Sequence, residues 1–137
     1  MLSVFERVLL LQDLEFFGSS PTEHLADFAS LCEVVEAGRG SVLFRSGDVC
    51  RSLYILARGK VVIEAEAGSA VEVQGDLLDC WSFFSQEPHR YTARTVEECT
   101  LLTVPFSELA ELLTAEPEFC WALTRQLAGR GYREGAS

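Results

Sequence analysis

The chain has 137 residues, of which 48% are hydrophobic and 23% are charged, and this composition is typical of one folded domain rather than of a disordered segment. Its formal net charge of −10 at pH 7 argues against nucleic acid and anionic membrane surfaces as direct partners, because both carry negative charge. The five cysteines are odd in number and have no metal-ligand spacing, so we expect free thiols in a reducing cytoplasm rather than a disulfide framework or a zinc site.

Residues 3–17, SVFERVLLLQDLEFF, are predicted to form a helix. Ser3 stands three positions before Glu6, which is the spacing of a capping box, and the apolar residues that follow give a broad hydrophobic face. The apolar run VLLL inside this helix is too short to span a bilayer, so we expect no membrane insertion.

Residues 19–35, SSPTEHLADFASLCEVV, are predicted to form a second helix. Ser20 is its expected N-cap, and Pro21 takes the first helical position, where the missing N–H of proline costs nothing. His24 is expected on the polar side of this helix start, and no function is predicted for it.

After Glu36 the pattern changes to short strand-like segments separated by glycine-containing turns. Several short strands at regular spacing indicate an all-β sandwich, roll or barrel. The segments are GSVLFRSGD, RSLYILARGK, KVVIEAEAGSA, VEVQGD, YTARTVEE and CTLLTVPF.

The helical period returns near residue 106 and predicts two further helices. Residues 106–117, FSELAELLTAEP, form the first, with Ser107 as its expected cap. Residues 117–131, PEFCWALTRQLAGRG, form the second, which Gly129 and Gly131 are expected to end. The predicted fold class is therefore mainly β with flanking helices.

Two of the strand segments carry a resemblance to a known family. GSVLFRSGD is similar to a G-x-hydrophobic-hydrophobic-x-x-x-G-D turn, and SLYILARGKVVI is similar to an x-L-Y-I-hydrophobic-x-x-G-x-V hairpin, both of the cyclic nucleotide-binding domain family. The matching positions are Gly40, Gly47, Asp48, Leu53, Tyr54, Ile55, Gly59 and Val61. The resemblance implies a single domain over 1–137, with an antiparallel double-stranded β-helix (a β-roll of the jelly-roll type) over 35–105 and helices over 1–34 and 106–131.

The segment GDLLDCWSFFSQEPHRYTA, residues 75–93, occupies the place of that family's phosphate-binding cassette, G-D-x-F-G-E-x-A-L-x-x-x-x-P-R-x-A-T. Laid without gaps, Gly75, Asp76, Pro88 and Thr92 match the pattern. The frame of the cassette is therefore retained.

The polar groups of the cassette differ from the family pattern. Asp79 stands in place of the second Gly, Cys80 in place of the Glu and His89 in place of the Arg, while Ser82 and Tyr91 take the two Ala positions. The resemblance implies that the Arg binds the cyclic phosphate through two charge-assisted hydrogen bonds and that the Glu accepts from the ribose 2′-hydroxyl. Loss of both contacts costs about 3–6 kcal/mol, which is on the order of 10² to 10⁴ in affinity.

Arg90 lies one residue past the position of the family's Arg. Neighbouring strand residues point to opposite faces, so Arg90 is predicted to point outward, although a local bulge would turn it inward. His89 is interpreted as a partly exposed loop histidine, with a phosphate ligand or a pH-sensitive switch as the alternatives.

The aromatic residues of the cassette allow two interpretations. Trp81, Phe83 and Phe84 either pack the short helix of the loop into the roll, which we favour, or form a platform for a purine. Cys80 is interpreted as a buried inert thiol rather than a redox-sensitive one. The candidate ligand-binding residues are Asp79, Cys80, Trp81, Ser82, His89, Arg90, Tyr91 and Thr92.

The favoured function is a non-catalytic regulatory or interaction module with a degenerate pocket, with weak or no cyclic nucleotide binding and no resident cofactor. It would contact a protein partner or a second copy through its helices. The alternative is a working sensor of cyclic AMP, cyclic GMP or another small anion that uses Arg90 in a rearranged cassette. No Ser/His/Asp set, metal cluster or glycine-rich nucleotide loop supports an enzyme.

Overall fold

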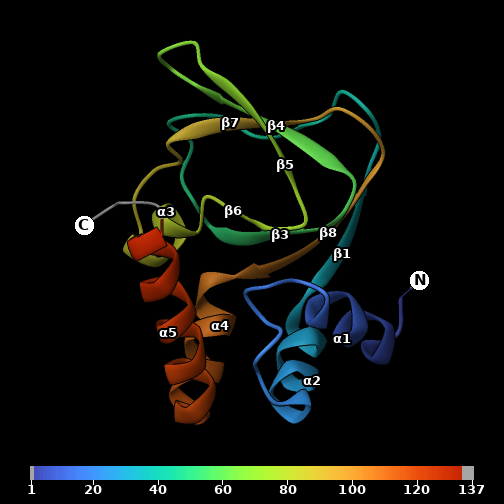
Figure 1. Cartoon of the computed structure of the whole chain (residues 1–137), viewed down its shortest axis with the longest axis vertical. Helices are drawn as coiled ribbons and strands as arrows, with labels where there is room; N and C mark the ends of the chain where they lie inside the picture. Colours follow the sequence, from blue (N-terminus) through green and yellow to red (C-terminus); the bar gives the residue numbers. More distant parts are fainter. Residues whose placement is uncertain (1, 134–137) are drawn as a thin grey trace. The chain divides into compact units, whose positions relative to one another are not determined.

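The computed structural model describes residues 2–133 (Figure 1). The chain divides into two compact units, a β unit that covers residues 32–106 and a helical unit built from the segments before and after it. No helix within the described residues combines the length and the apolar character that crossing a membrane requires.

The β unit contains two four-stranded antiparallel sheets, with strand orders β1-β8-β3-β6 and β2-β7-β4-β5. The strands are β1 (Glu33–Ala37), β2 (Val42–Phe44), β3 (Ser52–Arg58), β4 (Lys60–Ala65), β5 (Ala70–Gln74), β6 (Leu77–Leu78), β7 (Tyr91–Thr95) and β8 (Cys99–Pro105). Consecutive strands change sheets at almost every turn, so the chain winds as a double-stranded β-helix (Figure 1). The predicted β-roll is confirmed.

Gly59 lies between β3 and β4, where the chain crosses from one sheet to the other. Its φ of +98° is a conformation that only glycine adopts readily, and a β-carbon here would lie 2.5 Å from the carbonyl oxygen of Glu98. The glycine is therefore required both by the backbone conformation and by the close approach of the neighbouring chain.

Alternating side chains of both sheets fill the interior of the β unit. The side chains that form this core, each no more than 5% exposed, are Phe44, Leu56, Val61, Leu78, Ala93, Cys99 and Leu101. Leu78 and Ala93 belong to this core and lie near the two ends of the cassette in the sequence. The packing of the roll thus holds both ends of the cassette.

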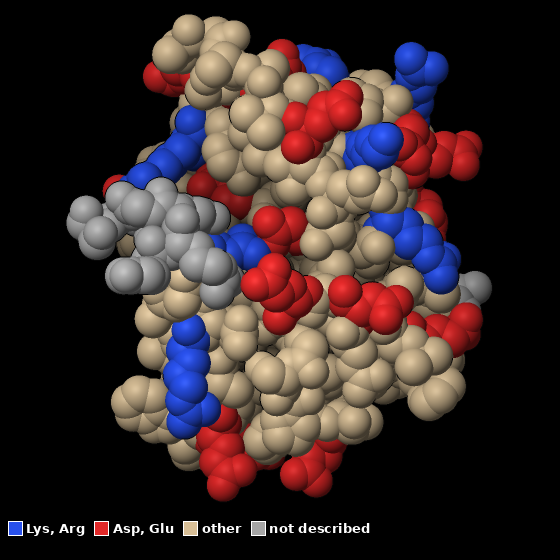
Figure 2. Space-filling model, viewed as in Figure 1, with Lys and Arg blue, Asp and Glu red and all other residues tan. Residues whose placement is uncertain are grey.

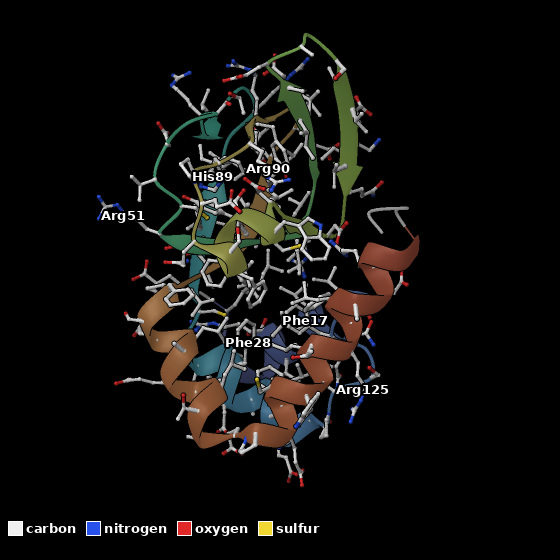
Figure 3. The ribbon with its side chains drawn as sticks, turned by 90° about the vertical axis from the view of Figure 1, so that its left-hand side faces the viewer. Phe17, Phe28, Arg51, His89, Arg90 and Arg125 are labelled. Carbon is white, nitrogen blue, oxygen red and sulfur yellow. The ribbon has the colours of Figure 1, made fainter. Side chains whose placement is uncertain are left out.

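The helical unit contains α1 (Val4–Gln12), α2 (Thr22–Leu31), α4 (Phe106–Ala115), whose first residue still belongs to the β unit, and α5 (Pro117–Arg133). The predicted capping box is confirmed, because Ser3 and Glu6 each accept the other's backbone N–H at 3.1 Å. Phe17 and Phe28, both fully buried, stack with their ring centroids 5.2 Å apart (Figure 3). Phe28 also contacts Phe119 of α5, at 5.7 Å, so aromatic packing joins α5 to α2.

The first predicted helix is shorter than its periodicity indicated. It ends at Gln12, and turns with i to i+3 hydrogen bonds follow through Ser20. These turns bury Phe16 and Phe17, which are 4% and 0% exposed, so burial of two phenylalanines outweighs the continuation of the helix.

The second predicted helix also ends early, at Leu31, and the EVV segment that was assigned to it belongs to β1. β1 pairs with β8, and Val34 lies opposite Leu102. The β-branched side chains of this segment suit a paired strand better than a helix. The expected N-cap role of Ser20 is wrong, since its hydroxyl is buried without a hydrogen-bond partner among the described residues. His24, expected on the polar side, is buried at 6% exposure.

The two C-terminal helices differ from expectation at their ends. α4 begins at Phe106, so Ser107 lies inside it and does not cap it. α5 continues through Gly129 and Gly131 as far as Arg133. A glycine inside a helix costs only about 1 kcal/mol relative to alanine. The other residues of α5 offset this cost, so the helix continues.

Candidate functional site

The cassette is a compact excursion between two strands of the β unit. β6 leads into a short helix, α3 (Cys80–Ser85), and an extended segment then leads into β7. Asp79 and Gln86, on either side of α3, adopt left-handed conformations with φ of 53° and 58°. The chain therefore reverses sharply at both ends of this helix, and it does so at non-glycine residues.

The Asp79 carboxylate is buried and receives hydrogen bonds from three directions. Its Oδ1 accepts from the Ser82 hydroxyl at 2.8 Å, and its Oδ2 accepts from the backbone N–H of Arg90 at 3.0 Å. Nδ1 of His89 lies 2.9 Å from the same Oδ2. An ionised carboxylate only accepts, so the His89 tautomer with its proton on Nδ1 is the one that completes this pair. Asp79 is thus turned inward, and its charge is held by the cassette itself.

His89 is 4% exposed, so its interpretation as a partly exposed loop histidine is wrong. Its ring stacks on that of Phe44 with centroids 3.8 Å apart and an angle of 11° between the planes. Its backbone N–H donates to the carbonyl of Asp48, and its carbonyl accepts from the N–H of Gly47. The turn between β2 and β3 therefore fixes His89 from outside the cassette.

Arg90 points outward, as the strand alternation predicted. Its side chain is 63% exposed and lies 3.9 Å from the carboxylate of Glu87, which is also exposed. Only the backbone N–H of Arg90 belongs to the Asp79 cluster. The sensor hypothesis requires the Arg90 guanidinium to point into the cassette. The exposed Arg90 side chain does not do so.

The residues of α3 differ in how far their side chains are buried. Cys80 is 2% exposed and not disulfide-bonded, and Ser82 is fully buried. Phe83 is 1% exposed and lies 5.5 Å from Phe106, whereas Trp81 is 37% exposed. The packing interpretation therefore fits Phe83, while Trp81 only partly contributes to the interior.

Tyr91 and Thr92 begin β7 in different surroundings. Burial raises the pKa of Tyr91, and the nearby negative charge of Asp79 raises it further. Thr92 accepts the backbone N–H of Ser46 at 3.1 Å and so supports the neighbouring turn rather than the Asp79 cluster. The structure thus brings together Asp79, Ser82, His89 and the backbone of Arg90, and leaves Thr92 outside that group.

Sequence reasoning missed two side chains beside the cassette. Phe44 supplies the ring that covers His89, and it comes from β2, far away in the sequence. Cys50 lies close enough to Asp79 to interact with its charge. Burial first and the charge of Asp79 second raise the pKa of the Cys50 thiol to about 11. Neither residue carries a local motif, although Phe44 lies inside the segment that resembles the family's first turn.

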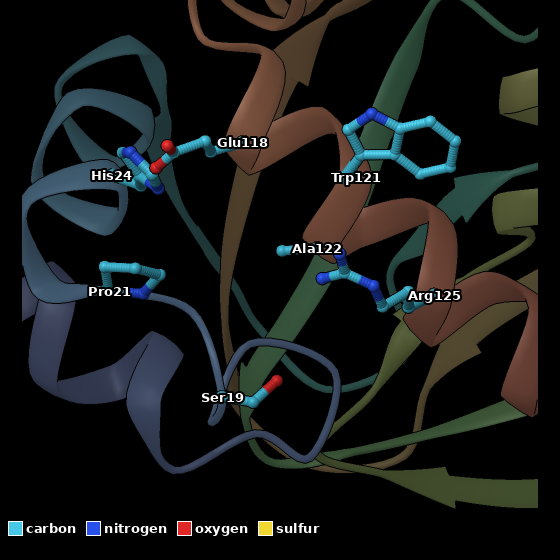
Figure 4. Close-up of a pocket in the computed structure, with 7 residues that line it drawn as sticks. All are labelled: Ser19, Pro21, His24, Glu118, Trp121, Ala122 and Arg125. Atoms are coloured by element: carbon cyan, nitrogen blue, oxygen red, sulfur yellow. The ribbon is translucent and has the colours of Figure 1, made fainter.

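A hollow of about 370 Å³ lies within the helical unit between α2 and α5 (Figure 4). The side chains that line it are Ser19, Pro21, His24, Glu118, Trp121, Ala122 and Arg125. Trp121 is 63% exposed, and Nδ1 of His24 has no hydrogen-bond partner among the described residues. Among all the residues that the structure describes, no three His, Cys, Asp or Glu side chains are placed to hold a metal ion.

The sequence matches the profile of the cyclic nucleotide-binding domain over residues 34–116, which is more than half of the chain. The chain belongs to the cyclic nucleotide-binding domain family. The matched segment of this family member includes all of the β-roll after Glu33 and the whole cassette. No curated protein sequence matches the chain.

Solved structures agree with the family assignment. The N-terminal domain of a transcriptional regulator from Streptomyces coelicolor is 26% identical, with a TM-score of 0.77, and the match covers 93% of this chain and 96% of that one. The regulatory domain of Toxoplasma gondii PKA, solved with cAMP, is 13% identical, with a TM-score of 0.76, and the match covers 95% of this chain and 50% of that one. Thermus thermophilus catabolite activator protein is 24% identical, with a TM-score of 0.74 over 88% of this chain and 59% of that one. The family member described here therefore corresponds to one domain of the latter two proteins.

Proposed function

We propose that the chain is a non-catalytic regulatory or interaction module that keeps the cyclic nucleotide-binding fold and binds cyclic nucleotide weakly or not at all. The observation that carries the proposal is the position of His89. It stands where the family's Arg is expected, and its buried ring is held by Phe44 on one side and the Asp79 carboxylate on another. The cassette therefore has no guanidinium for a phosphate.

The alternative, a sensor that uses Arg90, has weaker support. The Arg90 side chain lies on the exposed side of the chain beside Glu87. To reach an anion within the cassette it would have to exchange places with His89, which four backbone and side-chain contacts hold in place. The PKA domain solved with cAMP has the same fold, so the sensor remains the reading that a binding measurement must test.

The exposed apolar side chains of the helical unit support a role in protein contacts. On α1, Phe5 is 71% exposed, and Val4 and Leu9 are 41% and 46% exposed. On α5, Trp121 is 63% exposed. Large aromatic residues are enriched among the side chains that dominate protein interfaces, so we propose a protein partner or a second copy as the contact of these helices.

The surface charge and the free cysteines bear on the partners and the compartment that we propose. Acidic side chains are spread over the face that Figure 2 shows, with basic ones between them, and the net charge is −10. Such a surface does not favour nucleic acid. The five cysteines are all free, four of them buried, which suits a reducing cytoplasm.

Isothermal titration calorimetry with cyclic AMP and cyclic GMP tests the proposed function. The unaltered chain should bind both with dissociation constants in the high micromolar range or weaker, from the loss of about 3–6 kcal/mol of ligand contacts. The double variant Cys80→Glu/His89→Arg should recover part of the affinity, and adding Asp79→Gly should recover more. A low-micromolar constant for the unaltered chain would refute the proposal and favour the sensor.

A further inference from the structure

Three hydrogen-bond donors from separate positions of the cassette converge on one carboxylate. The Ser82 hydroxyl reaches Oδ1 of Asp79, while the Arg90 backbone N–H and Nδ1 of His89 reach Oδ2. Convergent N–H and O–H donors in a buried place are how proteins bind an oxyanion. Here the oxyanion is part of the chain.

Burial makes this cluster independent of the solvent. Asp79, Ser82 and His89 are 6%, 0% and 4% exposed. The charge of Asp79 also raises the pKa of the Cys50 thiol and of the Tyr91 hydroxyl, after burial itself, so both side chains lie within reach of the carboxylate's field. The carboxylate is therefore enclosed from several sides and is not a surface group that folds over an open site.

The backbone of Asp79 adds a second observation. Its φ of 53° and ψ of 44° are left-handed, a conformation that is unfavourable for a residue with a β-carbon. Glycine would adopt it freely, but glycine would leave the three donors without an acceptor. The conformation places the carboxylate on the donors, and the three hydrogen bonds offset its cost.

We infer that the Asp79 carboxylate is a permanent internal ligand of the cassette. It occupies the oxyanion position, ties α3 to the start of β7 in the absence of any added ligand, and excludes an external phosphate. The inference extends the proposed function, since it supplies the reason why this module has a fixed cassette that does not respond to a phosphate ligand. Removal of the carboxylate should turn the three donors into a site for a small oxyanion.

The test compares the unaltered 137-residue chain with Asp79→Gly, which suits the backbone conformation and empties the position, and with Asp79→Asn, which keeps it filled. Thermal unfolding is followed with and without inorganic phosphate, against chloride at equal ionic strength. Asp79→Gly should melt several degrees lower, and phosphate at roughly ten times its dissociation constant should raise its Tm by about 5 °C. The unaltered chain and Asp79→Asn should show less than about one fifth of that rise.

The double variant Asp79→Gly/Ser82→Ala is the matched control, because it removes one of the three donors while leaving the position empty. Its response to phosphate should be weaker than that of Asp79→Gly. An equal response of the unaltered chain and Asp79→Gly, or no response of folded Asp79→Gly, would overturn the inference. The outcome is separate from the proposed function, which only a cyclic nucleotide titration of the unaltered chain refutes.

A measurement on the unaltered chain keeps the inference testable should Asp79→Gly not fold. Amide hydrogen exchange followed by NMR should show the Arg90 N–H protected as strongly as the paired amides of β7, since it donates to a buried carboxylate. Exchange of that amide at the rate of an exposed loop would overturn the inference.

Discussion

Replacement of Gly59 by alanine tests how tightly the roll is closed where the chain changes sheets. The substitution adds a β-carbon at a φ of +98°, which costs about 1–2 kcal/mol for the backbone alone. That β-carbon would also lie 2.5 Å from the carbonyl oxygen of Glu98 and 2.6 Å from Sγ of Cys99. Since a backbone atom is among those that must shift, overpacking adds about 1–3 kcal/mol. We expect a total loss of about 2–5 kcal/mol in the free energy of unfolding.

Gly47→Ala is the matched control for this experiment. Gly47 has a φ of +90°, and a β-carbon there would meet no atom within 4 Å, so only the backbone cost of about 1–2 kcal/mol applies. Urea unfolding followed by circular dichroism measures both variants, with the free energies extrapolated linearly to water. Equal losses in the two variants would refute the steric argument for Gly59, and no loss in either would refute the argument from φ as well.

Two further predictions concern pH and surface contacts. Burial raises the pKa of Cys50 from 9.0 to about 11, so the unfolded thiol ionises first and the free energy of unfolding should fall between pH 9 and pH 11. Urea titrations from pH 8 to pH 11 measure this fall, and a slope that Cys50→Ala leaves unchanged would contradict it. Phe5→Ser and Trp121→Ala replace side chains that are 71% and 63% exposed, so each should change the free energy of unfolding by less than about 1 kcal/mol. At least one of them should reduce the self-association or partner binding seen in sedimentation velocity, and an unaltered chain that is monomeric at every concentration would exclude the homodimer.

The order of elements was readable from the sequence because its signals are local. Turn glycines such as Gly47 and Gly59 have positive φ, and the alternation after them defines strands. The outward direction of Arg90 followed from the same alternation, given the position of Pro88 and of the cassette frame. Helix ends were less predictable, since Phe16 and Phe17 leave the helical period in order to be buried.

The state of the cassette was decided by the tertiary structure. The family pattern placed Asp79 and His89 in the cassette as mismatches. Only the fold brings Phe44 against the His89 ring and the Asp48 carbonyl against its backbone, and so buries His89 within reach of Asp79. These contacts join β2 and the turn after it to the cassette across long stretches of chain, and no local period encodes which side chains meet there. The sequence therefore determined which groups the cassette lacks, and the packing of the roll determined what fills their place.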